Sequence, residues 1–409
     1  MILYWSTMWI KRDFLHFLTD LSSEKVLPVK VLRGPRQVGK TSLLDYMGRH
    51  QLVLFDDLGV RQLANENPSL FFEQFQGPII LDEATLAPNI FPEIKKRVDE
   101  ERRQLRTQNI SPTMDIWITG SNQTLLHQSV RESLAGRANY YNLNTLSLHE
   151  LTDHFKNFPD QYYLNTVLIR GGWPELYASP HLNPTQYLND FVSTFIEKDI
   201  VMAAGIEKKA AFMKVLQLAA ARVGQLLNFS DIAKNVGVDI TTVQSWVALL
   251  EENGILRVIQ PYFNNLNQRL IKTPKLYFED IALAVRLQGW TQIEPLMISP
   301  YFGNLLENLV FIEISRFFSN RGESVKIYFL RSKEQDEIDF LIELPNNRYI
   351  AIEVKSTPID MTNRQKKLLD SVSLNIVDRW IVTPIRSVDF SYARVIELQK
   401  IFEKIEALY

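Results

Sequence analysis

Residues 34–42 read GPRQVGKTS, and Gly34 to Thr41 match the phosphate-binding pattern G-x-x-x-x-G-K-[ST] without a gap. An apolar segment at 28–33 precedes this stretch, and an apolar-periodic segment at 43–50 follows it. This is the order of strand, glycine loop and helix that the pattern requires. Glycines let backbone N–H groups turn toward phosphate oxygens, and the helix N-terminus adds its positive end. The expected ATP-binding residues are Gly34, Pro35, Arg36, Gln37, Val38, Gly39, Lys40, Thr41 and Ser42.

A second strand completes the expected nucleotide site. Lys40 is expected to reach the β- and γ-phosphates, and the Thr41 hydroxyl to hold Mg²⁺. Residues 78–83, PIILDE, form an apolar segment that ends in two acids. An acid at such a strand end completes the magnesium shell in P-loop enzymes, and we expect Asp82 to fill this role. Glu83 is then expected to polarise the attacking water as a general base.

A third apolar strand, MDIWITGSN at 114–122, ends in small polar residues. A side chain at its tip would lie beside the γ-phosphate and could orient water, so Ser121 and Asn122 are catalytic candidates. A plain turn at the end of a strand has the same composition, and that alternative stays open.

These segments in this order resemble an AAA+ ATPase. One bacterial and archaeal family has motifs similar to GPRQVGKTSLL, LDEA, ITGSN and ESLAGR of this chain. In that family an AAA domain precedes a C-terminal domain of uncharacterised function. The resemblance continues through GGWPE at 171–175, DFVSTFIEKDI at 190–200, KTPKLYFED at 272–280 and GNLLEN at 303–308, and so covers residues 29–384. It implies rings or at least contacting subunits, because one subunit's arginine often completes the site of another.

The resemblance gives roles to two further residues. Arg137, in ESLAGR, is at the position where an AAA+ arginine could touch a γ-phosphate and stabilise the charge of the transferred group. A surface or salt-bridging arginine is the alternative. Gly172, Trp173 and Pro174 resemble the glycine-x-proline of related signalling ATPases, where the proline packs near the adenine. An ordinary tight turn is the alternative there.

The middle of the chain is rich in helical patterns. Residues 184–225 are expected to continue the small lid of an AAA+ site, and 228–256 read as a helix-turn-helix. Ser230 is expected to cap the first helix, and Gly237 to make the turn. The segments 255–262 and 274–280 could supply the strands of a wing. The second helix has no positive charge near its start, so DNA contact would depend on wing residues such as Arg269, Lys272 and Lys275; a structural or protein-contact role stays open.

The last part of the chain carries a possible metal site. An amphipathic helix from 303 bears Glu307, and the strand QDEIDFLIEL bears Asp339. Strand alternation puts Glu353 and Lys355 of RYIAIEVKS on one face. Glu307, Asp339 and Glu353 could chelate a divalent cation while Lys355 polarises water.

This order of acids followed by Glu-x-Lys resembles the core of PD-(D/E)xK nucleases. The resemblance implies Mg²⁺ binding and phosphodiester hydrolysis, with Glu353 and Lys355 as catalytic residues. A salt-bridged surface, or a site that no longer cuts, is the alternative. The basic segment at 363–372 could hold phosphate, or could be an ordinary solvated helix face.

The overall composition limits which binding partners and which kinds of site the sequence can have. With 45 basic and 47 acidic residues, net charge favours no polyanionic partner, and the absence of cysteine excludes disulfides and thiolate metal sites. No apolar run is long enough for a membrane span, and we expect a cytoplasmic protein without membrane contact. The apolar residues 2–10 are expected to pack as a strand or helix, and the mixed charges at 91–106 to form a solvated helix face.

The expected fold class is α/β. Residues 1–150 form a P-loop AAA+ core with a parallel sheet, residues 151–300 a helical lid and winged-helix-like region, and residues 301–409 a restriction-endonuclease-like α/β domain. The expected function is ATP hydrolysis that controls a DNA-acting C-terminal domain, in a homo-oligomer with ATP and Mg²⁺ as cofactors. A nucleotide-dependent switch that binds a protein partner, with a non-cleaving C-terminal domain, is the alternative.

Overall fold

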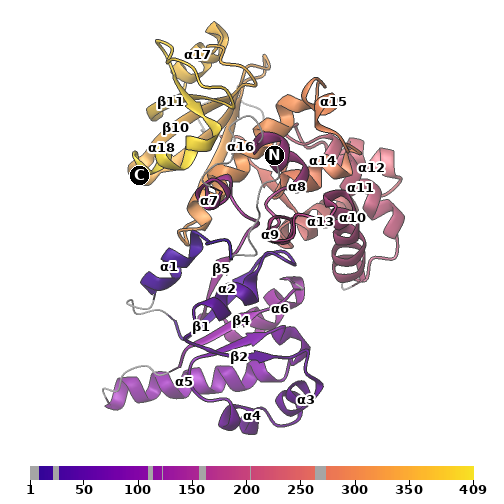
Figure 1. Ribbon diagram of the computed structural model, residues 1–409, viewed down its shortest axis with the longest axis vertical. Helices are drawn as coiled ribbons and strands as arrows, with labels where there is room; N and C mark the ends of the chain where they lie inside the picture. The colour runs from indigo at the N-terminus through magenta and orange to yellow at the C-terminus, as the bar shows by residue number, and fades with distance from the viewer. Residues whose placement is uncertain are drawn as a thin grey trace.

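The computed structural model describes residues 9–21, 27–108, 114–121, 123–155, 163–202, 204–262 and 273–409. Asn122, Arg269, Lys272 and most of the apolar segment 2–10 lie outside these ranges. Figure 1 shows the N-terminal region at the bottom, the middle region at the right and the C-terminal region at the upper left. Within the described residues, no helix combines the length and apolarity needed to cross a bilayer.

The N-terminal region is built on a five-stranded parallel sheet in the order β2-β3-β4-β1-β5. Parallel pairing brings the carboxyl ends of β1, β3 and β4 to one edge, which is the edge where the predicted site residues follow. The apolar residues of the central strands are buried on both faces, as a sheet covered by helices requires. The strands are β1 (Val29–Arg33), β2 (Gln51–Leu54), β3 (Ile79–Asp82), β4 (Ile116–Thr119) and β5 (Ala138–Asn142).

Helices flank this sheet (Figure 1). The longest, α5, buries Ile90, Ile94 and Val98 and leaves its mixed charges exposed or half-buried, so the expected solvated face is confirmed. A 3₁₀ turn, η1 (Ala84–Leu86), follows β3. The helices are α1 (Phe14–Leu21), α2 (Lys40–Tyr46), α3 (Leu58–Glu66), α4 (Pro68–Gln74), α5 (Ile90–Gln108) and α6 (Gln123–Leu134).

The middle region begins with helices, as the sequence pattern indicates. Gly171 and Gly172 separate the second and third of them, and neither has room for a side chain. A Cβ at Gly171 would overlap the Asp280 carboxylate, and one at Gly172 would overlap the Leu146 carbonyl. The segments are α7 (Leu148–His154), α8 (Tyr163–Arg170), α9 (Pro174–Ala178), α10 (Pro184–Phe191), the π-helical η2 (Val192–Met202) and α11 (Lys209–Ala221).

The expected helix-turn-helix consists of α12 (Phe229–Val236) and α13 (Ile240–Glu252). Gly237 adopts a left-handed conformation between them (φ 79°), as expected. The predicted cap was wrong: Asn228 accepts the N–H of Asp231 at 3.0 Å, and Ser230 lies inside the helix. An antiparallel pair, β6 (Leu256–Ile259) and β7 (Lys275–Phe278), and two helices, α14 (Ile281–Leu287) and α15 (Ile293–Met297), complete the region.

The C-terminal region is a five-stranded sheet in the order β12-β11-β10-β9-β8. The first three strands in the chain pair antiparallel, whereas β10, β11 and β12 are parallel. The elements are α16 (Phe302–Ser319), β8 (Lys326–Arg331), β9 (Glu337–Leu344), η3 (Pro345–Asn347), β10 (Arg348–Val354), α17 (Asn363–Asp370), β11 (Asn375–Thr383), β12 (Arg394–Glu397), η4 (Leu398–Lys400) and α18 (Ile401–Glu406).

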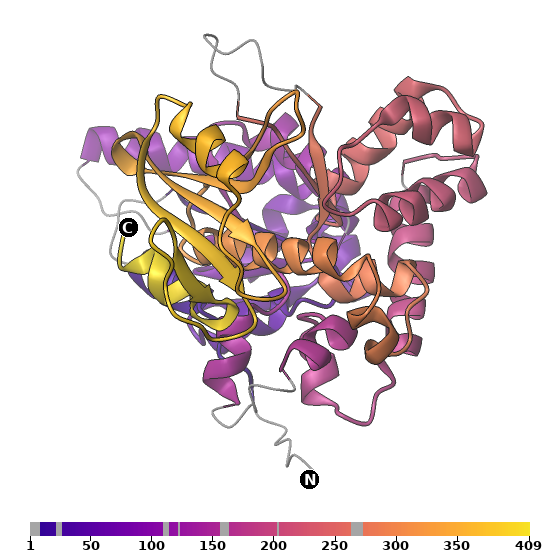
Figure 2. The same cartoon turned by 90° about the horizontal axis from the view of Figure 1, so that it is seen from above.

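Helix α16 joins the three regions. The expectation that it is amphipathic was wrong, because it is buried on nearly all sides, including Glu307, Glu313 and Arg316. Figure 2 shows it crossing the middle of the molecule beneath the C-terminal sheet. One continuous apolar core runs from the N-terminal sheet (Trp117) through the middle region to the inner face of the C-terminal sheet (Trp380). The three regions therefore share a core.

Buried charges of α16 meet the loop after β5 and the first residue of α7. The guanidinium of Arg316 donates to the Leu146 carbonyl at 2.6 Å, and the Glu313 carboxylate accepts the Leu148 N–H at 2.9 and 3.0 Å. Burial raises the pKa of Glu313 to about 7, although Arg316 and the Leu148 N–H oppose this change. The junction therefore holds a carboxyl group that titrates near neutrality.

This carboxyl group makes stability depend on pH. The unfolded chain releases the proton near pH 4.5, whereas folded Glu313 keeps it up to about pH 7. Its stabilising effect is therefore fully present below pH 4.5 and is lost as the pH rises through 7. In Glu313→Gln, we expect unfolding free energies at pH 5 and pH 8 to differ less than in the wild type, by up to about 3 kcal/mol. Glu403→Gln, an exposed change on α18, is the control; equal pH profiles for Glu313→Gln and wild type would contradict the assignment.

Candidate functional site

The glycine loop connects β1 to α2 and contains three residues with positive φ. Gly34 (φ 147°) has no room for a side chain, because a Cβ there would overlap the Leu143 carbonyl. Gln37 (φ 64°) and Gly39 (φ 88°) are in the left-handed region, and Gly39 directly precedes the first residue of α2. These turns bring the loop back over the helix N-terminus, which is the geometry that phosphate binding requires.

Lys40 points back into the loop. Its ammonium group donates to the carbonyls of Gly34 and Pro35, at 2.9 Å each. Burial lowers the pKa of Lys40 to about 8, although the charges of Glu83 and Asp82 oppose this change. A cation buried against neutral carbonyls gains from an added anion, and phosphate oxygens would supply one.

The predicted metal ligands lie side by side. The Thr41 hydroxyl donates to the Asp82 carboxylate at 2.7 Å, and the Thr119 hydroxyl donates to the same oxygen. Thr41 is the second residue of α2, Asp82 ends β3 and Thr119 ends β4, so the parallel sheet brings them together. Hydroxyl and carboxylate oxygens are ligands that Mg²⁺ prefers, and this pair fits the ion at the P-loop.

Glu83 is held by the next strand. The residue has φ 53°, and its carboxylate accepts both the N–H of Ser121, at 2.9 Å, and the Ser121 hydroxyl, at 3.0 Å. The structure thus brings two of the predicted catalytic residues into contact at the carboxyl edge of the sheet. Asn122, the third candidate there, lies outside the described residues.

The loop borders a cavity of about 630 Å³ that also reaches the middle region. Gln37, Val38, Gly39 and Ser42 line one side, and Pro174 and Glu175 of α9 line another. Its volume lies within the range of small-molecule sites. The predicted adenine-side residue Pro174 is therefore beside the phosphate loop, and Trp9, which stacks on Tyr46 with ring centroids 4.9 Å apart, adds an aromatic wall.

Arg137 lies away from this site. It precedes β5, whose first residue, Ala138, is level with Val29 at the start of β1, so Arg137 is at the opposite edge of the sheet from the loop. Its guanidinium forms two hydrogen bonds of 2.8 Å with the Asp99 carboxylate. Arg137 therefore makes the salt bridge that the sequence left open, and it does not contact the loop of its own chain.

The C-terminal acids converge on a lysine from the middle region. Glu307, Glu337 and Asp339 each offer an oxygen, and these three oxygens lie within 4.8 Å of one another. Lys275, on β7, donates to Glu307 at 2.8 Å and forms an ion pair with Glu337. Burial raises the pKa of Glu307 to about 8, against the opposing charge of Lys275. The carboxylates raise the pKa of Lys275 despite its burial, so the lysine stays charged.

Glu353 and Lys355 meet as strand alternation predicts. The Lys355 ammonium donates to Glu353 Oε1 at 2.6 Å, and the Gln365 amide donates to the same oxygen at 2.7 Å. The β9–β10 pairing brings Asp339 beside this strand, where it accepts the Val354 N–H at 2.8 Å. Glu353 Oε2 is buried and has no hydrogen-bond partner among the described residues. Burial raises the pKa of Glu353 to about 8, and the charge of Asp339 adds to the effect.

The acids as they stand do not fit an additional divalent cation, because the Lys275 ammonium already contacts two of the three carboxylates. The expectation that Lys275 could help DNA contact from the wing strands was wrong, since only 1% of the residue is accessible. At the start of α13, Thr241, Gln244 and Ser245 are exposed and uncharged. The structure therefore adds no basic surface from Lys275 to the proposed DNA contact.

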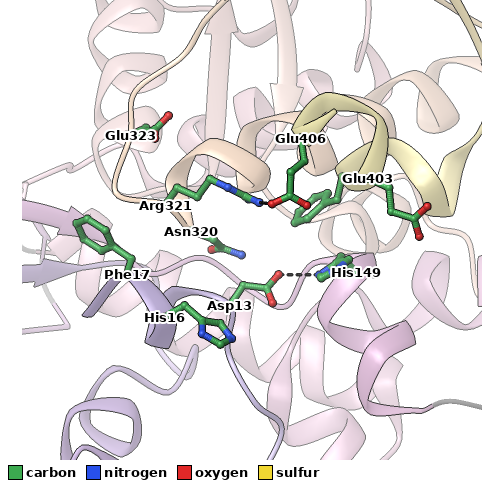
Figure 3. A pocket seen from close by; sticks show the side chains of 10 residues that line it. Asp13, His16, Phe17, His149, Asn320, Arg321, Glu323, Glu403 and Glu406 are labelled. Atoms are coloured by element: carbon green, nitrogen blue, oxygen red, sulfur yellow. Dashed lines mark hydrogen bonds and ion pairs between the residues drawn. The ribbon is translucent and has the colours of Figure 1, made fainter. Parts of the chain in front are cut away.

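A second cavity, of about 530 Å³, lies between α1, α7, α18 and the end of α16. Figure 3 shows Asp13 and His149 pointing toward each other across it, and their hydrogen bond is 2.8 Å long. Arg321 and Glu406 form a second pair, also at 2.8 Å. The hydrogen bond that His149 makes to the Asp13 carboxylate raises the pKa of His149 despite its partial burial. The first pair links the residue before α1 to α7, and the second lies within the C-terminal region, so neither involves the nucleotide loop.

Comparison with known proteins bears on the N-terminal region. Residues 27–152 match the family model of the AAA domain. The region is a P-loop ATPase domain of the AAA type. Residues 161–294 and 302–392 match two further family models, each described as a domain of unknown function. The nuclease-like character of the C-terminal region has no counterpart in these descriptions and stays a proposal.

Relatives extend beyond the AAA domain. An uncharacterised protein of Mycobacterium tuberculosis is 27% identical over 84% of this chain and 74% of its own length. An uncharacterised protein of Haemophilus influenzae is 28% identical over 76% of this chain and 79% of its own length. Among solved structures, the Walker-type ATPase of Pyrococcus abyssi shares 15% identity over 70% of this chain and 99% of its own, with a TM-score of 0.43. The ORC2 protein of Aeropyrum pernix shares 13% sequence identity over 60% of this chain and 85% of its own, with a TM-score of 0.35.

Sequence reasoning missed two residues that hold the loop of the AAA domain. Arg12 donates to the Val38 carbonyl at 2.9 Å and pairs with Glu150, also at 2.9 Å. Gln123 donates to the carbonyls of Gly34, at 2.9 Å, and Gly120, at 2.8 Å. Neither has a local signal in the sequence.

Sequence reasoning also missed Glu337 in the acid cluster. That residue could have been found, because Glu337 and Asp339 alternate with Ile338 on one strand and must share a face.

Proposed function

We propose that the protein binds ATP with Mg²⁺ at the P-loop of its AAA domain and hydrolyses it. The observation that carries the proposal is the hydrogen bond of 2.7 Å between Thr41 and Asp82, next to a loop whose lysine is buried against backbone carbonyls. A magnesium ion held there would neutralise charge on the phosphates. The adjoining cavity, with Trp9 and Pro174 in its walls, has room for the nucleoside.

The roles of the side chains follow from their places. Lys40 would exchange its two carbonyl partners for phosphate oxygens, which are stronger acceptors because they are charged. Glu83, at the carboxyl edge of the sheet, would accept a proton from the attacking water. Ser121 would hold the Glu83 carboxylate in orientation through the two hydrogen bonds that it already donates.

Two substitutions separate binding from turnover. Lys40→Ala should lower ATP hydrolysis by about 10²-fold or more, because the phosphates lose their charged donor. Glu83→Gln should still bind ATP in calorimetry, but its rate of hydrolysis should fall by about 10²-fold or more, because the amide cannot accept the proton. Lys96→Ala, an exposed change on α5, is the control. Retained turnover in Lys40→Ala would refute the phosphate site, and normal turnover in Glu83→Gln would remove that residue from the base role.

We further propose that Arg137 acts on the nucleotide of a neighbouring subunit. This is supported by its place at the edge of the sheet opposite its own loop, together with an ion pair to Asp99 in which both side chains are part-exposed. An arginine can leave such a pair at small cost. The homo-oligomer expected from the sequence would then be needed for turnover.

Mixing two inactive variants tests this role. Arg137→Ala should lower turnover by about 10³-fold, the effect expected for an arginine supplied in trans. Arg137→Ala mixed with Glu83→Gln should regain activity, because a shared site can combine Glu83 from one subunit with Arg137 from the other. Asp99→Ala, which leaves the arginine in place, should keep wild-type turnover. A mixture as inactive as its parts would argue against a site shared between subunits.

Nucleotide state is proposed to control the C-terminal region. Two contacts support this. Pro174 belongs to the turn whose Gly172 N–H donates to Asp280, just after β7, at 2.9 Å. The loop residue Pro35 lies against the turn at Gly254, where an added Cβ would be only 3.4 Å from its ring. A change at the phosphates would therefore reach the middle region directly, and the shared core would carry it further.

What the C-terminal region does has two candidate answers. The ion pairs of Lys275 with Glu307 and Glu337 favour a non-cleaving domain that binds a protein partner, since the acids already have a cation. The buried Glu353 Oε2, without a partner among the described residues, favours a metal-dependent nuclease, because such an oxygen gains from a cation.

Plasmid cleavage distinguishes the two answers. A nuclease should convert supercoiled plasmid to nicked or linear DNA with Mg²⁺ or Mn²⁺, and Glu353→Ala should abolish the conversion. The assay is run with and without ATP. Glu343→Ala, on β9 and paired with Lys326 at 3.0 Å, is the matched control. Identical DNA products from wild type and Glu353→Ala would leave the non-cleaving domain as the answer.

A further inference from the structure

Lys275 belongs to one region and its carboxylate partners to another. It begins β7, which pairs with β6 in a two-stranded sheet and forms a bridge to Leu226, whereas Glu307 is on α16 and Glu337 and Asp339 are on β9. The Tyr277 hydroxyl, on the same strand, also donates to Glu307, at 2.5 Å. The cation and the acids therefore come together only when β7 packs against the C-terminal region.

The environment of the ammonium group requires those acids. Only 2% of the Lys275 side chain is accessible, and the aromatic ring of Phe329 lies 5.4 Å from its nitrogen. Burying an unpaired charge costs several kcal/mol, so the lysine can be buried charged only because carboxylates surround it. The reverse also holds, since Glu307 and Asp339 are themselves buried.

The ammonium group contacts carboxylates that could also hold a metal ion. Three carboxylate oxygens within 4.8 Å of one another are the donor set that a divalent cation prefers, and two of the three carboxylates are bound by Lys275. An ammonium group and a metal ion cannot share these oxygens at such distances, because like charges repel. A second observation concerns the neighbouring strand: Glu353 Oε2, on β10 beside Asp339, is buried without a partner in the described part of the chain, and such an oxygen gains from a nearby cation.

We propose that Lys275 is an internal counter-ion that closes the cluster of Glu307, Glu337 and Asp339 to divalent cations, and that the cluster becomes a cation site when this lysine leaves. The proposal deepens the proposed control of the C-terminal region, on which its regulatory meaning rests. Strand β7 ends two residues before Asp280, whose carboxylate accepts the Gly172 N–H beside the nucleotide cavity. The lysine therefore lies on the segment whose Asp280 contacts the turn before Pro174, and Pro174 lines that cavity.

The test measures Mn²⁺ binding to the full chain without nucleotide. Binding is measured by calorimetry and, independently, by the loss of the EPR signal of the free ion. Lys275→Met keeps the length of the side chain and removes its charge. We expect it to bind one Mn²⁺ more than the wild type, at least about tenfold more tightly than any remaining wild-type binding. Lys275→Arg should behave as the wild type, because the positive charge stays. Lys326→Met, which removes an exposed lysine from the same sheet, should also bind as the wild type does.

Thermal unfolding supplies a second readout. Lys275→Met leaves buried carboxylates without their cation and should melt at a lower temperature, and Mn²⁺ should restore part of that loss while leaving the wild-type melting temperature unchanged. Adding Asp339→Asn to Lys275→Met should abolish both the extra ion and the restoration. If Lys275→Met proves insoluble, Lys275→Ala, which leaves space for water, takes its place in the same measurements.

Two results would overturn the proposal: equal Mn²⁺ binding by wild type and the charge-removing variant, or an extra ion that survives Asp339→Asn. ATP hydrolysis by Lys275→Met is measured alongside and should equal that of the wild type, because the P-loop is untouched. Failure of the proposed ATPase would appear as absent turnover in the wild type. Failure of the internal counter-ion would appear in metal binding alone, so the two outcomes are distinguishable.

Discussion

The carboxylate of Asp280 is the contact on which the assembly of the three regions depends. It accepts the Gly172 N–H at 2.9 Å and the Thr145 hydroxyl at 3.0 Å, and it caps α14 through the N–H groups of Ala282 and Leu283. A buried carboxylate must have such donors, because an unsatisfied charge in a core is strongly destabilising. One side chain therefore fixes the glycine turn, the loop after β5 and the start of a helix in a single arrangement.

Around this contact the three regions pack against one another. Arg316 reaches from α16 to Leu146 and to the Glu279 carbonyl, so the C-terminal region is tied to the same loop that the AAA domain sends toward the nucleotide cavity. The apolar core is continuous across these contacts. Packed cores pass between discrete arrangements rather than deforming gradually, which suits a protein whose nucleotide state is proposed to control a distant domain.

The parts of this structure that the sequence predicts are those specified by neighbouring residues. The glycine loop, the acids at the end of β3 and the contact of Glu353 with Lys355 each follow from spacing within one or two elements. The parallel sheet then brings Thr41 and Asp82 together, because parallel strands end at one edge.

The contacts that were not predicted join distant segments. Lys275 and Glu307 are 32 residues apart in the chain, and Arg12 and Glu150 are 138 apart. Their pairing is set by the packing of whole regions, and no local sequence pattern indicates that packing. Lys275 looked like a wing residue because its neighbours in sequence form a strand, and only the burial of that strand under α16 reverses the interpretation. Helix α16 was misread for the same reason, since its charged residues are satisfied by remote partners.

The hydrogen bond from Arg12 to the Val38 carbonyl means that the nucleotide-binding unit begins before β1. The match to the AAA family starts at residue 27, yet Trp9 and Arg12 stand in the wall of the cavity. A fragment that starts at β1 would carry the whole glycine loop and still lack both the aromatic wall and the arginine that steadies the loop from outside. Affinity for ATP is thus a property of a longer stretch of chain than the motif itself delimits.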